Sequence, residues 1–297
     1  MTPEDLLALL DSWLLNLRAE RKSAQTVKTY GDGVRAFLRW CEEEDLEPEL
    51  QKHTVNAFVV ALLDRKASDA TARSRQLSLR RFSAWLAAEG EIPHDDLAGL
   101  KPPRLDSKVV PELSEDQLKA LIAACKGNDL RDRRDEAIVR LMIETGARAG
   151  EVVAMETDDI SLKEGTAVVR RGKGGKGRTV PIGPQTCRAI DRYLRTRRAH
   201  RLASTAVLWL GDRGKGFSYY ALYDTLVWRG EVARIEDFHP HVLRHTAAGR
   251  WLAAGGSEGG LMAMAGWSRR DMIDRYTKAS SEKRAADEAR RLQLGDL

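Results

Sequence analysis

Residues 101–108 read KPPRLDSK and divide the chain into two parts. Two adjacent prolines cannot continue a helix, and the alternating charges leave no apolar face to bury. We therefore predict an extended linker over residues 101–111. It separates one domain in residues 1–100 from a second domain in residues 112–297, and a chain of 297 residues is long enough for both.

The part before the linker carries the signals of consecutive helices. Residues with capping or helix-forming character predict helix starts near Thr2, Ser23, Thr54 and Ser68. Gly90 is predicted to end the last of these helices, whereas Gly31 and Gly33 weaken the middle of the second. Residues 1–100 are therefore expected to form a small helical bundle.

The part after the linker is mainly helical, with one strand-rich stretch. Residues 114–117 read SEDQ, a capping-box pattern, and Gly146 is predicted to end the following helix. Residues 167–170 and 178–182 flank a glycine-rich tip and predict a hairpin, and a short strand is expected at Val207–Leu210. The fold class is thus α+β, mainly α with a small β-sheet.

The composition indicates a folded protein with a modest basic excess. Hydrophobic residues make up 42% of the chain, and the net charge of +5 is compatible with a polyanionic partner. The N-terminal stretch lacks the basic region and the cleavage site of a signal peptide, and no apolar run reaches membrane-spanning length. We therefore expect a cytoplasmic protein without membrane contact.

The cysteines are far apart in the sequence and form no CxxC or Cys/His cluster: they are Cys41, Cys125 and Cys187. We interpret them as core-filling thiols in a reducing compartment, and we predict no structural zinc site.

Tyr276 is the candidate nucleophile, and cationic residues are spread along the chain before it. A tyrosine hydroxyl has a pKa of about 10, so it attacks a phosphodiester only with help. The phosphate charge must be neutralised, and the leaving oxygen must receive a proton. Arg148, in the stretch TGARAGE at residues 145–151, offers a planar fork for phosphate. The alternative is a surface arginine paired with Glu151.

Lys173 lies in the glycine-rich tip of the predicted hairpin, where the backbone can approach a ligand closely. A lysine among other cations can serve as a general acid, and the alternative is a solvated basic turn. A P-loop does not fit, because the GxxxxGK[ST] spacing is missing and the segment joins two strands.

His241 and Arg244 are three residues apart in the stretch HPHVLRHT at residues 239–246, so they share one face of a helix. This spacing puts an imidazole and a guanidinium beside one anion. Metal binding by the clustered histidines is disfavoured because no carboxylate or cysteine completes a ligand set nearby, so His239 and His245 are interpreted as structural. Trp267 either donates its indole N–H to a phosphate oxygen or packs in the core.

Taken in order, these segments resemble the motifs of the tyrosine recombinase family, which comprises phage integrases and Xer-type enzymes. The matching segments read TGARAGE, GKGGKGRTVP, HVLRH and GWSRRDMIDRY. The resemblance covers the whole chain. It implies a helical, SAM-like core-binding domain, matched by the pattern Ser23, Thr26, Tyr30, Phe37 and Trp40, followed by a catalytic domain with a C-terminal tail helix.

The resemblance also implies a role for each site residue. Arg148 and Arg244 would clamp the scissile phosphate, and His241 would hydrogen-bond it and assist proton transfer. Trp267 would make a further phosphate contact, at a position where many members have histidine. Tyr276 would form a 3′-phosphotyrosyl bond.

Two lysines and one carboxylate complete this implied site. Lys173 would protonate the departing 5′ oxygen, with Lys176 as the rival candidate, and Glu151 would orient the cluster. The reaction would need no metal, no ATP and no other cofactor.

The implied partner is double-stranded DNA with a specific recombination site, in a prokaryotic cell or its phage and associated with the nucleoid. Four protomers would assemble around two duplexes, and accessory DNA-bending or directionality factors are compatible with this scheme. Residues 281–292 form a charged tail that would dock on a neighbouring protomer or remain a solvated helix. The predicted DNA contacts are Arg73, Arg75, Arg80, Arg81, Lys176 and Arg178. The spacing of the first four permits a basic helix face, and the alternative is a solvated surface.

Two other functions remain open from the sequence. One is a type IB topoisomerase-like enzyme that relaxes DNA without site preference. The other is a sequence-specific DNA-binding protein that is catalytically silent.

Overall fold

The computed structural model describes residues 2–104, 111–170, 177–270 and 272–273. The chain separates into two compact units, Met1–Lys108 and Val109–Leu297. Each unit has a hydrophobic core of its own. The predicted limits of the linker stay a prediction. Among the described helices, none is long and apolar enough to span a membrane.

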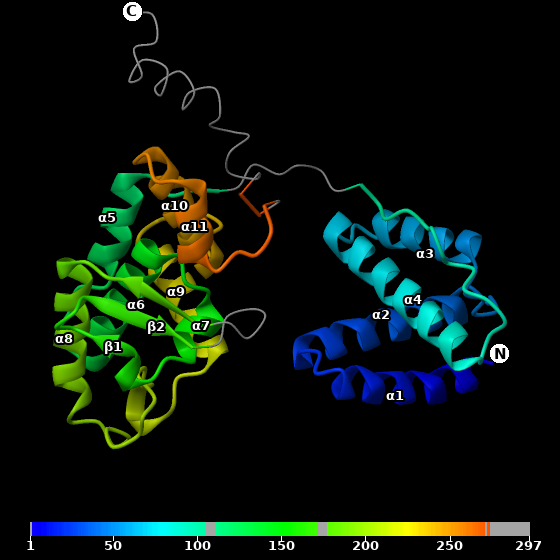
Figure 1. Ribbon diagram of the computed structural model, residues 1–297, viewed down its shortest axis with the longest axis horizontal. Helices are drawn as coiled ribbons and strands as arrows, with labels where there is room; N and C mark the ends of the chain where they lie inside the picture. The colour runs from blue at the N-terminus through cyan, green and yellow to red at the C-terminus, as the bar shows by residue number, and fades with distance from the viewer. Residues whose placement is uncertain (1, 105–110, 171–176, 271, 274–297) are drawn as a thin grey trace, which may run out of the picture. The chain divides into compact units, whose positions relative to one another are not determined.

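The described part of the first unit is a bundle of helices (Figure 1): α1 (Pro3–Ala19), α2 (Ala24–Glu43), α3 (Lys52–Asp64) and α4 (Asp69–Glu89). Thr2, Ser23 and Ser68 each accept a hydrogen bond from a backbone N–H in the first turn of α1, α2 and α4. Gly90 ends α4 in the left-handed conformation. The predicted caps at these positions are confirmed.

Aromatic side chains from all four of these helices fill the core of this bundle. The rings of Phe37 and Phe58 meet edge to face with centroids 5.5 Å apart, and Trp13 lies 5.1 Å from Phe82. Such pairs stabilise a fold by about 0.5–1.5 kcal/mol beyond the burial of their area. The bundle is therefore held by packing rather than by the intrinsic helix propensity of its segments.

Helix α2 runs without interruption through Gly31 and Gly33, although glycine has a low helix propensity. A Cβ atom at Gly33 would lie 2.3 Å from both Cβ and Oγ of Ser78 on α4. Gly33 thus permits a close approach of α2 to α4, and the packing between these helices outweighs the local weakness expected from the sequence.

We predict that Gly33→Ala lowers the free energy of unfolding by about 1–3 kcal/mol through overpacking. The loss should occur even though alanine favours a helix by roughly 1 kcal/mol over glycine. Urea denaturation of the full chain measures it. Adding Ser78→Gly removes the opposing Cβ. The double variant should therefore lose less free energy of unfolding than the two single substitutions lose together. An alanine variant as stable as the parent would contradict the close approach.

The described part of the second unit combines helices with a small sheet (Figure 1). Its helices are α5 (Glu115–Ala124), α6 (Leu130–Thr145), α7 (Ala149–Val153), α8 (Pro184–Arg197), α9 (Tyr219–Val232), α10 (Pro240–Ala253) and α11 (Glu258–Ala265). Short 3-10 turns are at Thr157–Asp159 and Asp212–Gly214. The strands are β1 (Ile160–Ser161), β2 (Thr166–Val169) and β3 (Arg178–Pro181).

The sheet is antiparallel in the order β1-β2-β3, with Val168 opposite Thr179. The predicted hairpin is confirmed, whereas the predicted strand at Val207–Leu210 is wrong. Val207 and Leu210 form only single bridges, because side chains take up the backbone groups of this stretch. The hydroxyl of Tyr193 accepts from the N–H of Leu210 and donates to the carbonyl of Leu208, which Arg197 also contacts.

Helix α6 is central to the second unit and packs against α8 and α10. Ala137, Ile138, Leu141 and Met142 are all buried, as their helical spacing predicts. The capping box at the start of α5 is confirmed. Gly146 ends α6 in the left-handed conformation, also as predicted.

A buried ion-pair cluster fixes α9 against α6. Asp135 accepts hydrogen bonds from Arg134 at 2.8 Å and from Arg229 at 2.8 Å, and Arg229 also contacts Asp132 at 2.6 Å. Buried charges are tolerated only when they are paired in this way. Removing one partner would leave a buried charge without a counter-charge, which would strongly destabilise the fold. Because α9 leads into α10, the cluster also helps to place the helix that carries His241 and Arg244.

The three cysteines are free thiols, and Cys41 and Cys125 are buried while Cys187 is half-buried. Burial raises the pKa of Cys41 to about 11 and that of Cys125 to about 12. The prediction of core-filling thiols is confirmed.

Candidate active site

Two helices of the second unit end close together, and each ends at a glycine. Gly146 closes α6 with a φ of 62°, and Gly266 closes α11 with a φ of 63°. The last carbonyls of a helix lack partners within the helix and carry partial negative charge, so they attract cations. Both helix ends here receive an arginine.

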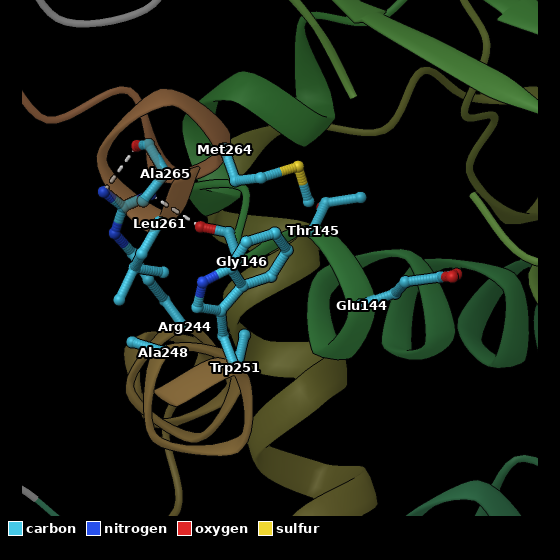
Figure 2. A pocket seen from close by; sticks show the side chains of 10 residues that line it. Glu144, Thr145, Gly146, Arg244, Ala248, Trp251, Leu261, Met264 and Ala265 are labelled. Atoms are coloured by element: carbon cyan, nitrogen blue, oxygen red, sulfur yellow. Dashed lines mark hydrogen bonds between the residues drawn. The ribbon is translucent and has the colours of Figure 1, made fainter. Parts of the chain in front are cut away.

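Arg244 on α10 joins the two helix ends (Figure 2). Its side chain is only 2% exposed. Nη1 donates to the carbonyl of Gly146 at 2.6 Å, and Nη2 donates to the carbonyl of Ala265 at 2.7 Å. The guanidinium carbon lies 5.1 Å from the centre of the Trp267 ring. One buried cation therefore connects α6, α10 and α11.

Arg148 stands two residues after Gly146, at the start of α7. Its Nη1 donates to Oε1 of Glu151 at 2.7 Å, and its backbone N–H donates to Oε2 at 2.9 Å. The pairing with Glu151 weighed from the sequence is thus present. The Arg148 side chain remains 26% exposed, so the same guanidinium is also accessible from outside.

Glu151 is shared by two arginines. Besides Arg148, it accepts from Nη1 of Arg178 at 3.2 Å and from Nη2 of Arg178 at 2.8 Å. Burial alone would raise the pKa of Glu151, but the hydrogen bonds from Arg178 and Arg148 outweigh it and hold the pKa below its usual range. The carboxylate therefore stays charged and orients both guanidinium groups.

His241 lies in the first turn of α10, one turn before Arg244, so the predicted placement of both residues on one helix is confirmed. The His241 side chain is exposed, and its ring meets that of His245 edge to face with centroids 4.5 Å apart. Within the described part of the chain, no group of three or more His, Cys, Asp or Glu residues is arranged to hold a metal ion.

Trp267 follows Gly266 and is 6% exposed. It packs with Ala248, Leu252, Leu261, Ala265 and Ile273 in a small apolar cluster beside Arg244. Core packing, one of the two roles weighed for this residue, is therefore present. A phosphate contact by its indole stays a prediction.

Lys173, Lys176 and Tyr276 lie outside the described residues, as does the charged tail at 281–292. The described strands β2 and β3 lead to the segment that carries the two lysines. The described residue Ile273 precedes the tyrosine in the chain.

The structure does not place the four arginines of α4 on one face. An α-helix turns about 100° per residue, so Arg73 and Arg80 lie on the same side, whereas Arg75 lies about 160° from Arg73. Arg75 lines a hollow with Thr29 and Asp32 of α2. Arg75 therefore points away from Arg73 and Arg80, and Arg81 is turned about 100° from Arg80. DNA contacts by these residues stay predictions.

The surroundings of Arg178 also differ from those expected. It was predicted as a DNA contact, but its side chain is only 11% exposed and is engaged by Glu151 and by the carbonyl of Met264. The sequence does hold one signal of this, because residue 178 stands at the start of a strand whose neighbours Val180 and Ile182 are buried. Strand alternation puts 178 on the same side as these two residues.

The comparisons with known proteins agree with this architecture. The model of the phage integrase family matches residues 111–283. The model of the phage integrase N-terminal SAM-like domain matches residues 10–90. The chain belongs to the phage integrase family.

Two relatives extend the similarity over most of the chain. Tyrosine recombinase XerD of Bifidobacterium longum is 29% identical over 289 residues, covering 92% of this chain and 93% of the relative. Tyrosine recombinase XerD of Mycobacterium tuberculosis is 31% identical over 264 residues, covering 83% of this chain and 85% of the relative. This member of the phage integrase family is thus a tyrosine recombinase by sequence.

Solved structures share the fold. The XerA recombinase has a TM-score of 0.53 at 26% identity and covers 92% of this chain and 93% of its own. The Tn1549 transposon integrase in complex with transposon right end DNA has a TM-score of 0.73 at 17% identity and covers 98% of this chain and 99% of its own. The predicted class, mainly α with a small sheet and an N-terminal SAM-like domain, is confirmed.

We predict that Glu151→Gln lowers the free energy of unfolding at pH 7 by roughly 1–3 kcal/mol, because the charged acceptor shared by the guanidinium groups of Arg148 and Arg178 is lost. A carboxylate with a depressed pKa stabilises the fold above its unfolded pKa and loses this effect as the pH falls through the folded pKa. The difference from the parent should therefore persist from pH 7 down to about 4.3, the pKa of an unfolded glutamate, and shrink only as the pH falls further toward the lower folded pKa. Urea denaturation across this range measures it.

Glu115→Gln is the matched control, because Glu115 pairs with Arg250 at an exposed site and should matter little. Equal stability of Glu151→Gln and the parent at pH 7 would contradict the role assigned to this carboxylate.

Proposed function

We propose that this tyrosine recombinase cleaves and rejoins DNA at a specific site through a 3′-phosphotyrosyl intermediate. The observation that carries the proposal is the junction at Arg244. It brings the turn with Arg148, the helix with His241 and the chain entering Trp267 to one place. These are the segments in which the sequence motifs of the reaction lie.

The two arginines supply the positive charge for the reacting phosphate. In-line attack on a phosphodiester adds negative charge to the phosphorus centre, and fixed guanidinium groups stabilise this charge without reorganising. Arg148 is held by Glu151 and Arg244 by two backbone carbonyls, so both are oriented before DNA arrives. His241, on the same helix as Arg244, hydrogen-bonds the phosphate, and Trp267 borders it.

Tyr276 is the nucleophile in this scheme. Its hydroxyl oxygen attacks the phosphorus and passes its proton to His241, while the bond from phosphorus to the 5′ oxygen breaks. Lys173 gives the leaving oxygen a proton, with Lys176 as the alternative donor. Rejoining reverses these steps, as a 5′ hydroxyl attacks the phosphotyrosine and the phenol leaves. The phosphodiester bond energy is retained, so no ATP is consumed.

The assembly follows from the same proposal. Residues 1–100 bind DNA, residues 112–297 carry out catalysis, and residues 101–111 link them. A lambda integrase tetramer has been solved bound to a Holliday junction, with a TM-score of 0.67 at 17% identity to this chain. Its assembly supports four protomers around two duplexes here. Accessory DNA-bending or directionality factors would act on this complex, inside the cell where its DNA lies.

We predict that the parent protein forms a covalent adduct with a suicide DNA substrate that carries its recombination site. Tyr276→Phe should form none but should bind the DNA with unchanged affinity, because only the attacking oxygen is missing. Denaturing electrophoresis detects the adduct, and a gel shift measures binding. Adducts formed by Tyr276→Phe would refute the assignment of the nucleophile. Relaxation of any plasmid, without dependence on a site, would instead indicate a topoisomerase.

We also predict that Arg73, which is exposed, and Arg80, which is half-buried, contribute phosphate contacts from α4. Each lost contact lowers the slope of log K against log salt by about 0.9. The double variant Arg73→Gln/Arg80→Gln should therefore bind more weakly, with a slope shallower by about 2. Arg65→Gln is the control, because Arg65 pairs with Glu43 and Glu44. An unchanged slope in the double variant would exclude these two arginines from the DNA interface.

A further inference from the structure

Arg178 at the start of β3 connects three parts of the site. Its Nε donates to the carbonyl of Met264 at 2.7 Å, near the end of α11. Its two Nη atoms donate to Glu151, on α7. Each of its three nitrogens thus has a partner inside the protein, and a planar fork facing a carboxylate is the strong bidentate form of this interaction.

The end of α11 is held by two arginines from different elements. Arg178 donates a hydrogen bond to the carbonyl of Met264, and Arg244 donates one to the carbonyl of the next residue, Ala265. The chain then turns at Gly266, where a Cβ atom would lie 3.0 Å from Nη1 of Arg178. The approach of Arg178 to this turn is therefore close, and the turn directs the chain to Trp267 and onward to Tyr276.

The Nη atoms of Arg178 are connected to Arg148 through the carboxylate of Glu151. Oε1 of Glu151 accepts from both Arg148 at 2.7 Å and Arg178 at 3.2 Å. A shift of Arg178 would therefore move the acceptor that orients Arg148 and, at the same time, remove one of the two arginine contacts at the end of α11. Arg178 thus touches both of these segments and belongs to β3 of the hairpin.

We propose that Arg178 is a positioning residue, which fixes the start of the nucleophile segment against the Arg148 turn, and that it does not contact DNA. This inference rests on the proposed function, since it concerns the geometry of that reaction. A displacement of about 1 Å between reacting groups can cost roughly 100-fold in rate. Loss of the Arg178 fork should therefore slow strand cleavage without weakening DNA binding.

Arg178→Lys separates the two roles. Lysine keeps the positive charge and would preserve a phosphate contact, but its single ammonium group cannot replace a fork that bridges Glu151 and Met264. We expect adduct formation by Arg178→Lys under saturating protein to slow by roughly 100-fold. DNA affinity and its salt slope should match the parent. Arg178→Gln should be slowed at least as much, again with an unchanged slope.

Arg170→Lys is the matched control on the same hairpin. Arg170 follows directly after β2, is half-exposed and pairs with Glu156 and Asp159 rather than with α11. Its cleavage rate should equal that of the parent. Equal slowing of Arg178→Lys and Arg170→Lys would overturn the proposal, as would an Arg178→Lys variant that cleaves at the parent's rate. A salt slope lowered by about 1 in Arg178→Gln would assign the residue to the DNA interface instead.

A second measurement does not depend on activity. The N–H groups of Gly266 and Trp267 donate to the carbonyls of Ala263 and Met262. Hydrogen exchange of these two amides, measured without DNA, should be faster in Arg178→Lys than in the parent or in Arg170→Lys. Unchanged protection would refute the positioning role. If the parent protein forms no adduct, the proposed function is contradicted. If Arg178→Lys still exchanges these amides faster than that parent, the positioning role remains supported.

Discussion

A single buried guanidinium holds the candidate site together. Arg244 is removed from water, and burying a charge costs several kcal/mol unless polar partners replace the solvent. The partners are the carbonyls of Gly146 and Ala265, which the ends of two helices leave without intrahelical hydrogen bonds. The arginine therefore satisfies two helix ends, and the helix ends stabilise the arginine. Arg148 follows one of these ends and Trp267 follows the other, so their places depend on this contact.

The second constraint is the sharing of Glu151. Three arginines lie around these helix ends, and one buried carboxylate contacts two of them, Arg148 and Arg178. Excess positive charge in a site with few countercharges attracts a phosphate. Because the guanidinium groups are fixed in orientation, they stabilise the transition state more than the bound DNA before reaction. The same carboxylate couples the hairpin to the helix ends. Binding, orientation and the course of the chain toward Tyr276 thus have a common physical origin.

Much of the fold was predictable because it depends on local chemistry. Side-chain caps at Ser23 and Ser68, the glycine end of α6 and the hairpin at β2 and β3 each follow from a few neighbouring residues. The placement of His241 and Arg244 on one helix follows from spacing alone. The family resemblance then indicated which segments meet, which no local pattern could do.

The misses arose where distant parts of the chain decide the outcome. Gly33 lies in a helix that the sequence predicts, but its close approach to Ser78 of α4 involves a distant part of the chain. The segment Val207–Leu210 has the composition of a strand, but Tyr193 and Arg197 bind its backbone. Arg178 resembles a surface cation in a basic hairpin, yet its partners are contributed by α7 and α11. A two-residue strand such as β1 is too short to show a period.

The most direct test is a structure of the chain bound to its DNA site, trapped with Tyr276→Phe before cleavage. We predict that the guanidinium groups of Arg148 and Arg244 both lie within hydrogen-bonding distance of the same backbone phosphate, next to the side chain at position 276. A phosphate that contacts only one of these arginines, or a position 276 remote from it, would contradict the central claim that Arg244 assembles one site for one phosphodiester.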